Sequence, residues 1–359
     1  MEKVRLGDIC VKQSSKLAQK DLENMDGSYP IFGASGLIKK INTYDQKAEY
    51  VAVVKDGAGV GRTMLLPAYS SVIGTLQYLI PNDNFNAKYL YYAVKSRHLE
   101  KYYTGSAIPH IYFKDYKSEP IILFDRIAQK KIVLVLERVE KIIEKQKQQL
   151  EMLDTLIKAR FVEMFGDPMN NPCGYEHIKL SDIATYFNGL TYKPENVTED
   201  GTIVLRSSNI QNGQLDFLDT VRVNCAIKER IMVQENDILM CSRNGSAKLV
   251  GKVALVKDIQ EPMSFGAFMM IIRSQYFGYL MTYFQMDAFR QQIKTSATTT
   301  INQITGRMLD NITIPLPPIT MVEQYTAFIE QVDKSKSAIQ KSLEKTQTLF
   351  DSLMQEYFG

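Results

Sequence analysis

The glycine-rich run DGAGVGRT, from Asp56 to Thr63, has residue types that suggest a site for chemistry. A nucleotide-binding P-loop needs a glycine, four residues and then Gly-Lys-Ser/Thr, because its backbone amides and its lysine surround the phosphates. Here the first glycine of that pattern would fall at Asp56, and Arg62 takes the place of the lysine. The run is better explained as a strand turn that brings backbone and the Arg62 cation to the surface of a binding partner.

The sequence lacks the side-chain combinations of an enzyme site. A DNA amino-methyltransferase holds its target amino group with an Asn/Asp-Pro-Pro-aromatic motif, but the one Pro-Pro pair, Pro317-Pro318, stands between leucine and isoleucine. The histidines have no patterned Cys or Asp partner, and the cysteines lack metal-site spacing. We therefore expect no catalytic residues, no bound cofactor and no metal site in this chain.

Polar loops remain as candidate contact surfaces. Arginine and asparagine can hydrogen-bond a base edge at two points, and Ser, Thr and Lys commonly hold phosphates. Loops that carry such side chains supply the candidate DNA-binding residues Lys55, Arg62, Thr63, His110, Arg206, Ser207, Asn209, Arg243, Asn244, Lys248, Lys252 and Thr299. The alternative is that these are ordinary solvated turns, which have the same composition.

A long helix from Ile127 to Phe165 is predicted to follow the first of these loops. The stretch has no Gly or Pro, and the 3-4 spacing of its apolar residues predicts a rod of about 58 Å that needs a partner helix. The last segment of the chain repeats it at a constant offset of 193 residues, so that Phe165-Gly166 falls on Phe358-Gly359. The seam of the two helices is expected to contain Leu136, Val139, Ile143, Leu150, Leu153, Ile157, Ile329, Val332, Ile339, Leu343, Phe350 and Leu353.

Charge and polar seam residues favour pairing of these two helices with each other. Residues 126–165 carry a net charge of +3, whereas residues 319–359 carry −2. Gln146 and Lys336 interrupt the seams at different repeat positions, a device that usually fixes register at some cost in stability. Two unrelated solvated helices are the alternative, which the constant offset argues against.

The regions that precede the helices repeat as well, with looser spacing. VRLGDI from Val4 matches IKLSDI from Ile178, and further along the chain Arg62 corresponds to Lys252. Short strands between Gly-, Asn- and Asp-rich turns indicate a mixed α/β module in each case. One helix is expected over Ala87–Leu99 in the first module and one over Phe277–Ile293 in the second.

The sequence thus predicts an α+β protein of duplicated design. Two pseudo-repeated mixed α/β domains, at 1–125 and 167–318, are each followed by a long helix, at 126–166 and 319–359. The chain has 359 residues and a net charge of +3. Its sparse cysteines fit a reducing cytosol, and it shows neither a signal sequence nor a membrane span, so a soluble cytoplasmic protein is expected.

This organisation resembles the specificity subunit of type I restriction-modification systems over nearly the whole chain. Both halves open with Lys/Arg-Leu-x-Asp-Ile, at Arg5–Ile9 and Lys179–Ile183, and both end in the repeated helix. The second helix is entered through Ile314-Pro315-Leu316-Pro317-Pro318 with Gln324 nearby, while the first copy has Gln129 but lacks the double proline.

The resemblance implies a function that requires no chemistry of this chain. Each half would be a target-recognition domain that reads one half-site of a bipartite DNA target. The two helices would pack as an antiparallel coiled coil that spaces the domains and docks two methyltransferase (modification) subunits. Those subunits would bind S-adenosylmethionine and methylate adenine, and restriction motor-nuclease subunits would join them; no membrane is involved.

Two other classes of protein remain as alternatives. One is a coiled-coil adaptor whose globular halves bind proteins, which would ignore duplex DNA even beside a methyltransferase. The other is a self-sufficient methyltransferase or nuclease, which the missing motifs argue against. The bases recognised do not follow from the loop sequences by any general rule.

Overall fold

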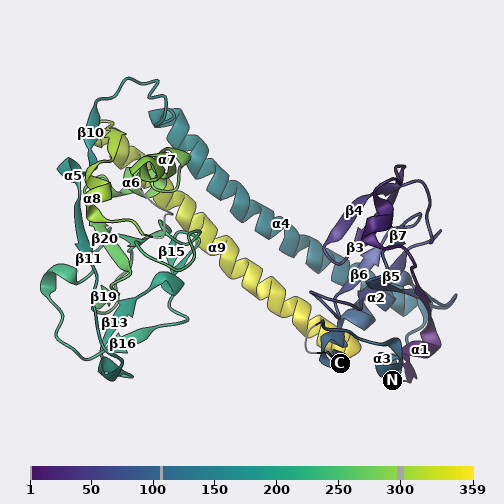
Figure 1. Cartoon of the computed structure of the whole chain (residues 1–359). Helices are drawn as coiled ribbons and strands as arrows, with labels where there is room; N and C mark the ends of the chain where they lie inside the picture. The colour runs from purple at the N-terminus through teal and green to yellow at the C-terminus, as the bar shows by residue number, and fades with distance from the viewer. Residues whose placement is uncertain (1, 106–107, 297–302) are drawn as a thin grey trace. The chain divides into compact units, whose positions relative to one another are not determined.

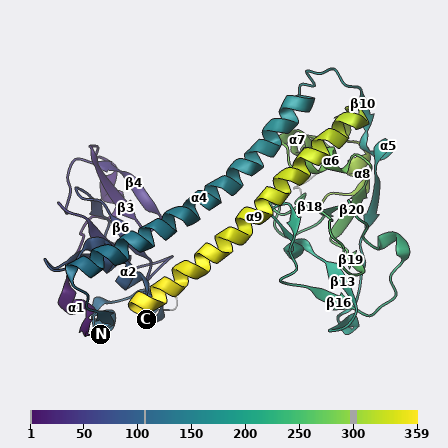
Figure 2. The same cartoon turned by 180° about the vertical axis from the view of Figure 1, so that it is seen from behind.

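A computed structural model describes residues 2–105, 108–296 and 303–359 of the chain. The chain forms two compact units. Unit 1 contains Met1–Gln149 and Ile339–Gly359, and unit 2 contains Leu150–Ala338. Each unit holds one globular module and a segment of both long helices (Figures 1 and 2).

The module of unit 1 is built on short strands. They are β1 (Lys3–Arg5), β2 (Cys10–Ser14), β3 (Tyr29–Gly33), β4 (Gly36–Ile41), β5 (Tyr50–Val54), β6 (Thr63–Leu66), β7 (Ser71–Val72), β8 (Leu76–Pro81) and β9 (Pro120–Ile122). An antiparallel sheet has the order β2-β8-β5-β6, and a second sheet, β4-β3-β7, contains the parallel pair β3·β7. The module's helices are α1 (Leu6–Ile9), α2 (Ala87–Lys95) and α3 (Phe113–Tyr116), with 3-10 turns at Gln19–Leu22 and Leu99–Tyr102.

The module of unit 2 has a similar set of strands. They are β10 (His177–Lys179), β11 (Thr185–Asn188), β12 (Val197–Thr198), β13 (Thr202–Leu205), β14 (Ile210–Gln211), β15 (Gln214–Leu215), β16 (Val221–Val223), β17 (Ile238–Cys241), β18 (Val253–Leu255), β19 (Met263–Phe265), β20 (Met269–Arg273) and β21 (Thr313–Pro315). The sheets are β11-β20-β17-β18 and β12-β16-β13-β19, with β14 paired to β15. The helices are α5 (Leu180–Ile183), α6 (Phe277–Tyr283), α7 (Asp287–Ser296) and α8 (Gly306–Asp310), with 3-10 turns at Pro194–Asn196, Ser207–Asn209 and Glu229–Ile231.

Strand order confirms the duplication inferred from the sequence. The antiparallel sheets β2-β8-β5-β6 and β11-β20-β17-β18 have the same topology, and each module adds one parallel strand pair, β3·β7 or β13·β19. The glycine turns also correspond, since the Gly61 amide donates to Val54 over 2.8 Å and the Gly251 amide donates to Cys241 over 2.8 Å. Both glycines have a left-handed φ, +87° and +79°, which a side chain would strain. The two modules are copies of one fold.

The two long helices are α4 (Arg126–Phe165) and α9 (Ile319–Phe358), each of 40 residues. The carboxylate of Asp125 accepts the Ala128 amide over 2.8 Å at the start of α4, and Gly166, with a φ of +75°, follows its end. Both helices begin and end at positions related by the predicted 193-residue offset. In the described part of the chain, no helix is long and apolar enough to span a bilayer.

Aromatic side chains at the helix ends join the cores of the modules. In unit 1 the ring of Phe358, at the end of α9, lies 5.3 Å from the ring of Tyr89, whose hydroxyl donates to Ile122. In unit 2 the ring of Phe165, at the end of α4, lies 5.2 Å from that of Tyr279. Each module therefore holds the end of the other repeat's helix, so the helix segments in each unit run antiparallel (Figures 1 and 2).

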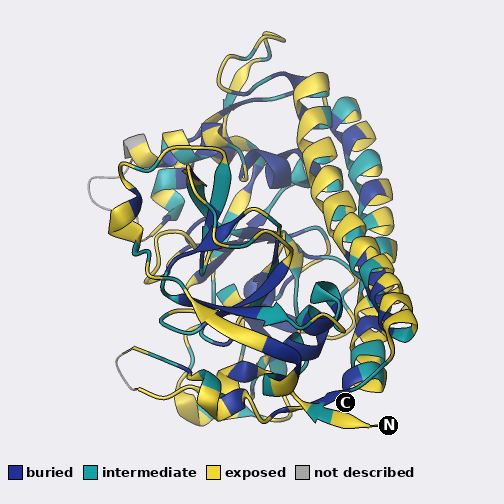
Figure 3. Cartoon of the chain, turned by 90° about the vertical axis from the view of Figure 1, so that its right-hand side faces the viewer, coloured by how far each residue is buried: buried dark blue, intermediate teal, exposed yellow. Residues whose placement is uncertain are grey.

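The seam between the helices is buried or half-buried at every predicted seam position. Figure 3 shows this alternation along the helices, whose outer faces are exposed. The central strands β5, β17 and β20 are buried, whereas β2 is mostly exposed. At the polar interruptions, the Gln146 amide donates to the Ser342 hydroxyl over 2.8 Å in unit 1, and Lys336 lies 2.6 Å from Asp154 in unit 2. Both polar seam residues thus meet a partner on the facing helix.

The helices predicted over Ala87–Leu99 and Phe277–Ile293 are shorter in the structure than the sequence suggested. The first ends at Lys95 because His98 takes a left-handed φ of 51°, which turns Leu99 into the core. The second is divided into α6 and α7. This division brings the buried rings of Phe284 and Phe289 to 4.9 Å from each other.

Candidate nucleic-acid interface

The strand ends of unit 2 gather the predicted contact loops at one edge of the module. β13 and β19 run parallel and end side by side at Leu205 and Phe265. β17 ends at Cys241, opposite Met269, the first residue of β20. Because only Gly266–Phe268 separates β19 from β20, the ends of both sheets lie close together. The loops that carry Arg206 and Arg243 therefore leave the module at the same edge.

A hollow of about 410 Å³ opens at this edge. Its walls include Arg206 and Ser207 together with the aromatic rings of Tyr192 and Phe268. Phe268 is 60% exposed, and the guanidinium of Arg243 lies 5.5 Å from the centre of its ring. Exposed aromatic rings and arginine planes stack on bases, and guanidinium groups hydrogen-bond base edges. The edge thus combines stacking surfaces with directional donors.

Arg206 is held in place but keeps donor capacity. Its Nη2 donates to a carboxylate oxygen of Asp219 over 2.8 Å, in a pair whose aspartate side chain is well exposed. Within the described residues, its Nε is buried without a hydrogen-bond acceptor. An exposed ion pair contributes only about 0–1 kcal/mol, so a phosphate or base edge can compete with the aspartate for this guanidinium.

Asn209 hydrogen-bonds the backbone of its own loop and is not exposed for contact with DNA. It is 1% exposed, and its side-chain oxygen accepts the Arg206 amide over 2.8 Å. Its side-chain nitrogen donates to the carbonyls of Asp216 and Asp219, both over 2.8 Å. The predicted contact residue is thus the internal support of the loop that presents Arg206.

The other predicted residues of unit 2 surround the turn between β17 and β18. Arg243 and Lys248 are exposed, and the ammonium of Lys252 lies 3.5 Å from Gln211. The Asn244 side chain donates to the Ser207 hydroxyl over 3.3 Å, which ties this turn to the loop after β13. Thr299 lies outside the described residues.

Unit 1 places its predicted residues around the equivalent turn between β5 and β6. Arg62 is exposed, and its guanidinium donates to the Ala34 carbonyl over 2.9 Å, while Thr63 opens β6. The segment of His110 crosses the start of the turn, because the Ile111 amide donates to Lys55 over 2.9 Å. His110 is therefore brought to the same edge as Lys55 and Arg62.

His110 is a partly buried member of this group. Its Nδ1 contacts a carboxylate oxygen of Asp56, and its ring lies 4.0 Å from the ring of Tyr112. Burial, and after it the charge of Lys55, lowers the pKa of His110 from its ordinary value of 6.5. A neutral imidazole at pH 7 donates its Nδ1 proton to Asp56, which aligns the ring beside the glycine turn.

Equivalent hydrogen bonds place one cation in each module. The Val54 amide donates to the Arg62 carbonyl over 2.9 Å, and the Cys241 amide donates to the Lys252 carbonyl over 2.8 Å. Both bonds close the turn at the end of the corresponding strand, β5 or β17. Arg62 and Lys252 therefore occupy the same structural position.

Several neighbours were not predicted from the sequence. Tyr192 and Phe268 line the hollow of unit 2, and Lys12 on β2 is close enough to Lys55 to help lower its pKa, after the larger effect of burial. No sequence signal marked Phe268, because Arg243, whose guanidinium lies 5.5 Å from its ring, is 25 residues away in the chain. Lys12 lies within a strand, and only the sheet pairing brings it to the edge.

Comparisons with known proteins agree with this architecture. The family model described as "Type I restriction modification DNA specificity domain" matches residues 1–152 and 172–347, one match for each module and the larger part of its helix. The EcoKI specificity subunit of Escherichia coli K12 is 30% identical over 183 residues, which cover 47% of this chain and 39% of that protein. The MjaVIII specificity subunit of Methanocaldococcus jannaschii is 23% identical over 398 residues, which cover 97% of this chain and 91% of that protein.

Solved structures share the fold. The S subunit of a type I restriction-modification system from M. genitalium covers 100% of this chain and 96% of its own, with a TM-score of 0.64 and 16% identity. A chain from a study of assembly and conformational transition of the type I R-M system covers 99% of this chain and 97% of its own, with a TM-score of 0.57 and 15% identity. With the family model matching both modules, the chain belongs to the type I restriction-modification DNA specificity family.

Proposed function

We propose that this chain is the non-catalytic specificity subunit of a type I restriction-modification enzyme and reads a bipartite double-stranded DNA target. The observation that carries the proposal is the matched edge of the two modules, where Arg62 and Lys252 occupy the same position in copies of one fold. Two copies of one reading surface in a single chain suit a target made of two half-sites. The proposed recognition domains are residues 1–125 and 167–318.

The edge of unit 2 has the groups for two kinds of DNA contact. Exposed lysines such as Lys248 would hold phosphates, which supply affinity without sequence information. Arg206 and Arg243 would reach base edges, with Phe268 as an apolar surface beside them. In unit 1 the corresponding phosphate contact would come from Arg62, and the free Nε2 of His110 would accept a hydrogen bond from a base.

The exposed face of α4 supports a docking role for the helices. In unit 1 the large apolar residues Ile127, Leu134, Val135 and Ile142 are 37–68% exposed. Their spacing of seven, one and seven residues puts them on one face of a helix, apart from the buried seam residues such as Leu136. An uncovered apolar stripe of this kind marks an interaction surface.

We infer that modification subunits cover this stripe, because methylation needs a methyltransferase and this chain has no catalytic motif of its own. The proposed complex contains two modification subunits, which bind S-adenosylmethionine, and motor-nuclease subunits for restriction. It would act in the cytoplasm, where the DNA is. The long helices, 126–166 and 319–359, would then serve both as docking surface and as spacer.

Methylation in cells tests the proposal. The gene is expressed with its modification subunit in a host that lacks adenine methylation, and the methylated motif is read by long-read sequencing. We expect one bipartite motif with a fixed gap. Methylation at a continuous short site, or the same methylation without this chain, would overturn the proposal and favour a coiled-coil protein adaptor.

A further inference from the structure

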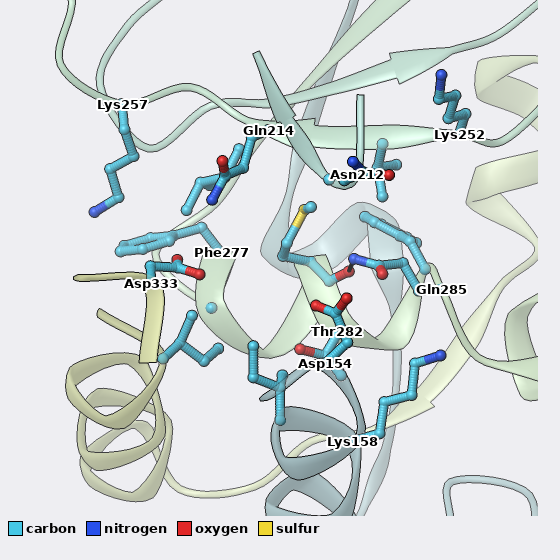
Figure 4. Close-up of a pocket in the computed structure, with 18 of the residues that line it drawn as sticks. Asp154, Lys158, Asn212, Gln214, Lys252, Lys257, Phe277, Thr282, Gln285 and Asp333 are labelled. Carbon is cyan, nitrogen blue, oxygen red and sulfur yellow. Dashed lines mark hydrogen bonds between the residues drawn. The ribbon is translucent and has the colours of Figure 1, made fainter. Parts of the chain in front are cut away.

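A second hollow of unit 2, of about 470 Å³, lies between α6, the β14–β15 turn and the two long helices (Figure 4). Its apolar walls include Ile157, Phe277 and Ile329. Carboxylates of both long helices, Asp154 and Asp333, also line it. The volume and the mixed lining are those of a site for a small group rather than of a packing defect.

Unit 1 has a hollow of about 420 Å³ at the equivalent position. Lys95, Glu140 and Phe350 line it, and the repeat relates them to Gln285, Asp333 and Ile157, which line the hollow of unit 2. Lys95 is the last residue of α2, and Gln285 lies two residues after the end of α6. This pair has the same 190-residue offset as Tyr89 and Tyr279. The other two pairs obey the offset of 193 between the long helices. The two hollows are therefore copies of one site.

The copy in unit 1 holds a cation of its own chain. The ammonium of Lys95 lies 3.1 Å from Glu140, and it is 5.3 Å from the ring centres of both Tyr91 and Phe350. The other oxygen of Glu140 accepts the hydroxyl of Tyr92 over 2.6 Å. This carboxylate is thus fully satisfied from within unit 1, by an ammonium that also contacts two aromatic rings.

The copy in unit 2 keeps the carboxylate but has lost both partners. Gln285 replaces Lys95, and Thr282 replaces Tyr92 and is hydrogen-bonded over 2.9 Å to Tyr325 instead. Within the described residues, no hydrogen bond or ion pair reaches the carboxylate of Asp333.

The lysines near Asp333 are already engaged. Lys336 lies 2.6 Å from Asp154, and Lys257 lies 3.0 Å from Glu330. Burial is the largest influence on Asp333 and raises the pKa of its carboxyl above the ordinary value of 3.8. These five charged groups sum to one negative charge around Asp333. Lys158, Lys248, Lys252 and Arg290 also line the hollow, but they are not among the charges that shift the pKa of this carboxyl.

We propose that the hollow of unit 2 binds a basic side chain, lysine or arginine, of a partner protein, which takes the place that Lys95 fills in unit 1. The proposal rests on the proposed function, because the partner is the modification subunit that docks on the helices. In Figure 4 Asp333 and Phe277 lie on one side of the opening, and Lys158 and Gln285 on the other. The docking segment therefore presents its basic side chain toward Asp333 and an acidic one toward Lys158.

The two copies differ in what they can bind. A hollow that is filled by its own lysine offers no anchor, whereas one with an unmatched carboxylate and apolar walls does. A charge-assisted hydrogen bond at such a site contributes about 1.5–3 kcal/mol, equivalent to about tenfold or more in affinity. The segments of α4 and α9 in unit 2 would thus make a contact with the partner that the equivalent segments in unit 1 cannot make.

Isothermal titration of the full-length chain with its purified modification subunit tests this anchor. Asp333→Asn removes the charge, and Gln285→Lys supplies an ammonium as in unit 1; we expect each to raise Kd about tenfold or more. Glu323→Gln, an exposed carboxylate of α9 outside the hollow, is the matched control and should leave Kd unchanged. Melting temperatures of all variants show that each is folded.

The outcomes separate the anchor from the proposed function. Wild-type binding with the same Kd for Asp333→Asn and Gln285→Lys would overturn the anchor and leave the specificity-subunit function intact. No binding by the wild type would overturn both. A rise in wild-type melting temperature with spermidine that Asp333→Asn abolishes, together with unchanged Kd for the modification subunit, would overturn the protein partner in favour of a small organic cation.

Discussion

Arg62 and Lys252 give the sharpest test of the reading edges, because the repeat assigns them the same role. We expect Arg62→Ala and Lys252→Ala each to remove one phosphate contact from the complex with target DNA. Each lost contact lowers the slope of log affinity against log salt by about 0.9. Between 50 and 200 mM salt, that difference amounts to a factor of about 3.5 in affinity per residue.

The structure indicates that these substitutions leave the fold intact. The Arg62 guanidinium makes one hydrogen bond, over 2.9 Å to the Ala34 carbonyl, and is exposed. The Lys252 ammonium contacts Gln211 at the long distance of 3.5 Å. Neither loss should cost more than about 1.5 kcal/mol of stability, since net contributions of such bonds are about 0.5–1.5 kcal/mol.

Fluorescence anisotropy with labelled duplex, repeated from 50 to 200 mM salt, measures the slopes. The control is Lys228→Ala, which removes an exposed lysine at the opposite edge of the module. Its segment lies there because the amide of nearby Val233 donates to the carbonyl of Met263, the first residue of β19. Its slope should equal that of the wild type. Unchanged slopes for both Arg62→Ala and Lys252→Ala, or an equal fall for Lys228→Ala, would refute the assignment of these edges to DNA.

Two further predictions concern stability. Lys336→Ile together with Asp154→Gln, which replaces the ion pair by its repeat equivalents Ile143 and Gln347, should raise the melting temperature by an amount equivalent to about 1 kcal/mol, because the lysine side chain is only 14% exposed. Ile143→Lys should lower the melting temperature by an amount equivalent to several kcal/mol, and calorimetry that found the opposite signs would contradict the seam. Asn209→Ala should destabilise unit 2 by about 2–3 kcal/mol, since three partly buried backbone hydrogen bonds are lost. Arg206→Ala should leave the melting temperature unchanged and weaken DNA binding; equal melting temperatures for the two variants would show that the loop does not depend on Asn209.

The long helices could be predicted from the sequence because their signals are local. A Gly- and Pro-free heptad pattern defined α4 to within one residue at its start, and the constant offset then defined α9. Gly61 and Gly251 similarly revealed the repeated turn, since a positive φ favours glycine wherever it occurs. These features need no knowledge of distant contacts.

The burial and the contacts of loop side chains could not be predicted in the same way. Asn209 and Arg206 look alike as polar loop residues, yet one is buried in its loop and the other lines the hollow. The pairing of His110 with Asp56 depends on a chain crossing 54 residues apart. Likewise, the unmatched Asp333 can be identified only when its contacts are compared with those of its repeat partner.

Module exchange tests the central claim most directly. Residues 1–125 are replaced by the matching module of a relative with a different motif, the long helices are kept, and the hybrid is expressed with the modification subunit. Long-read sequencing of methylated adenine should show one half-site replaced and the other half-site unchanged. Two altered half-sites, or an unaltered motif, would contradict an account in which each module reads its own half of the target.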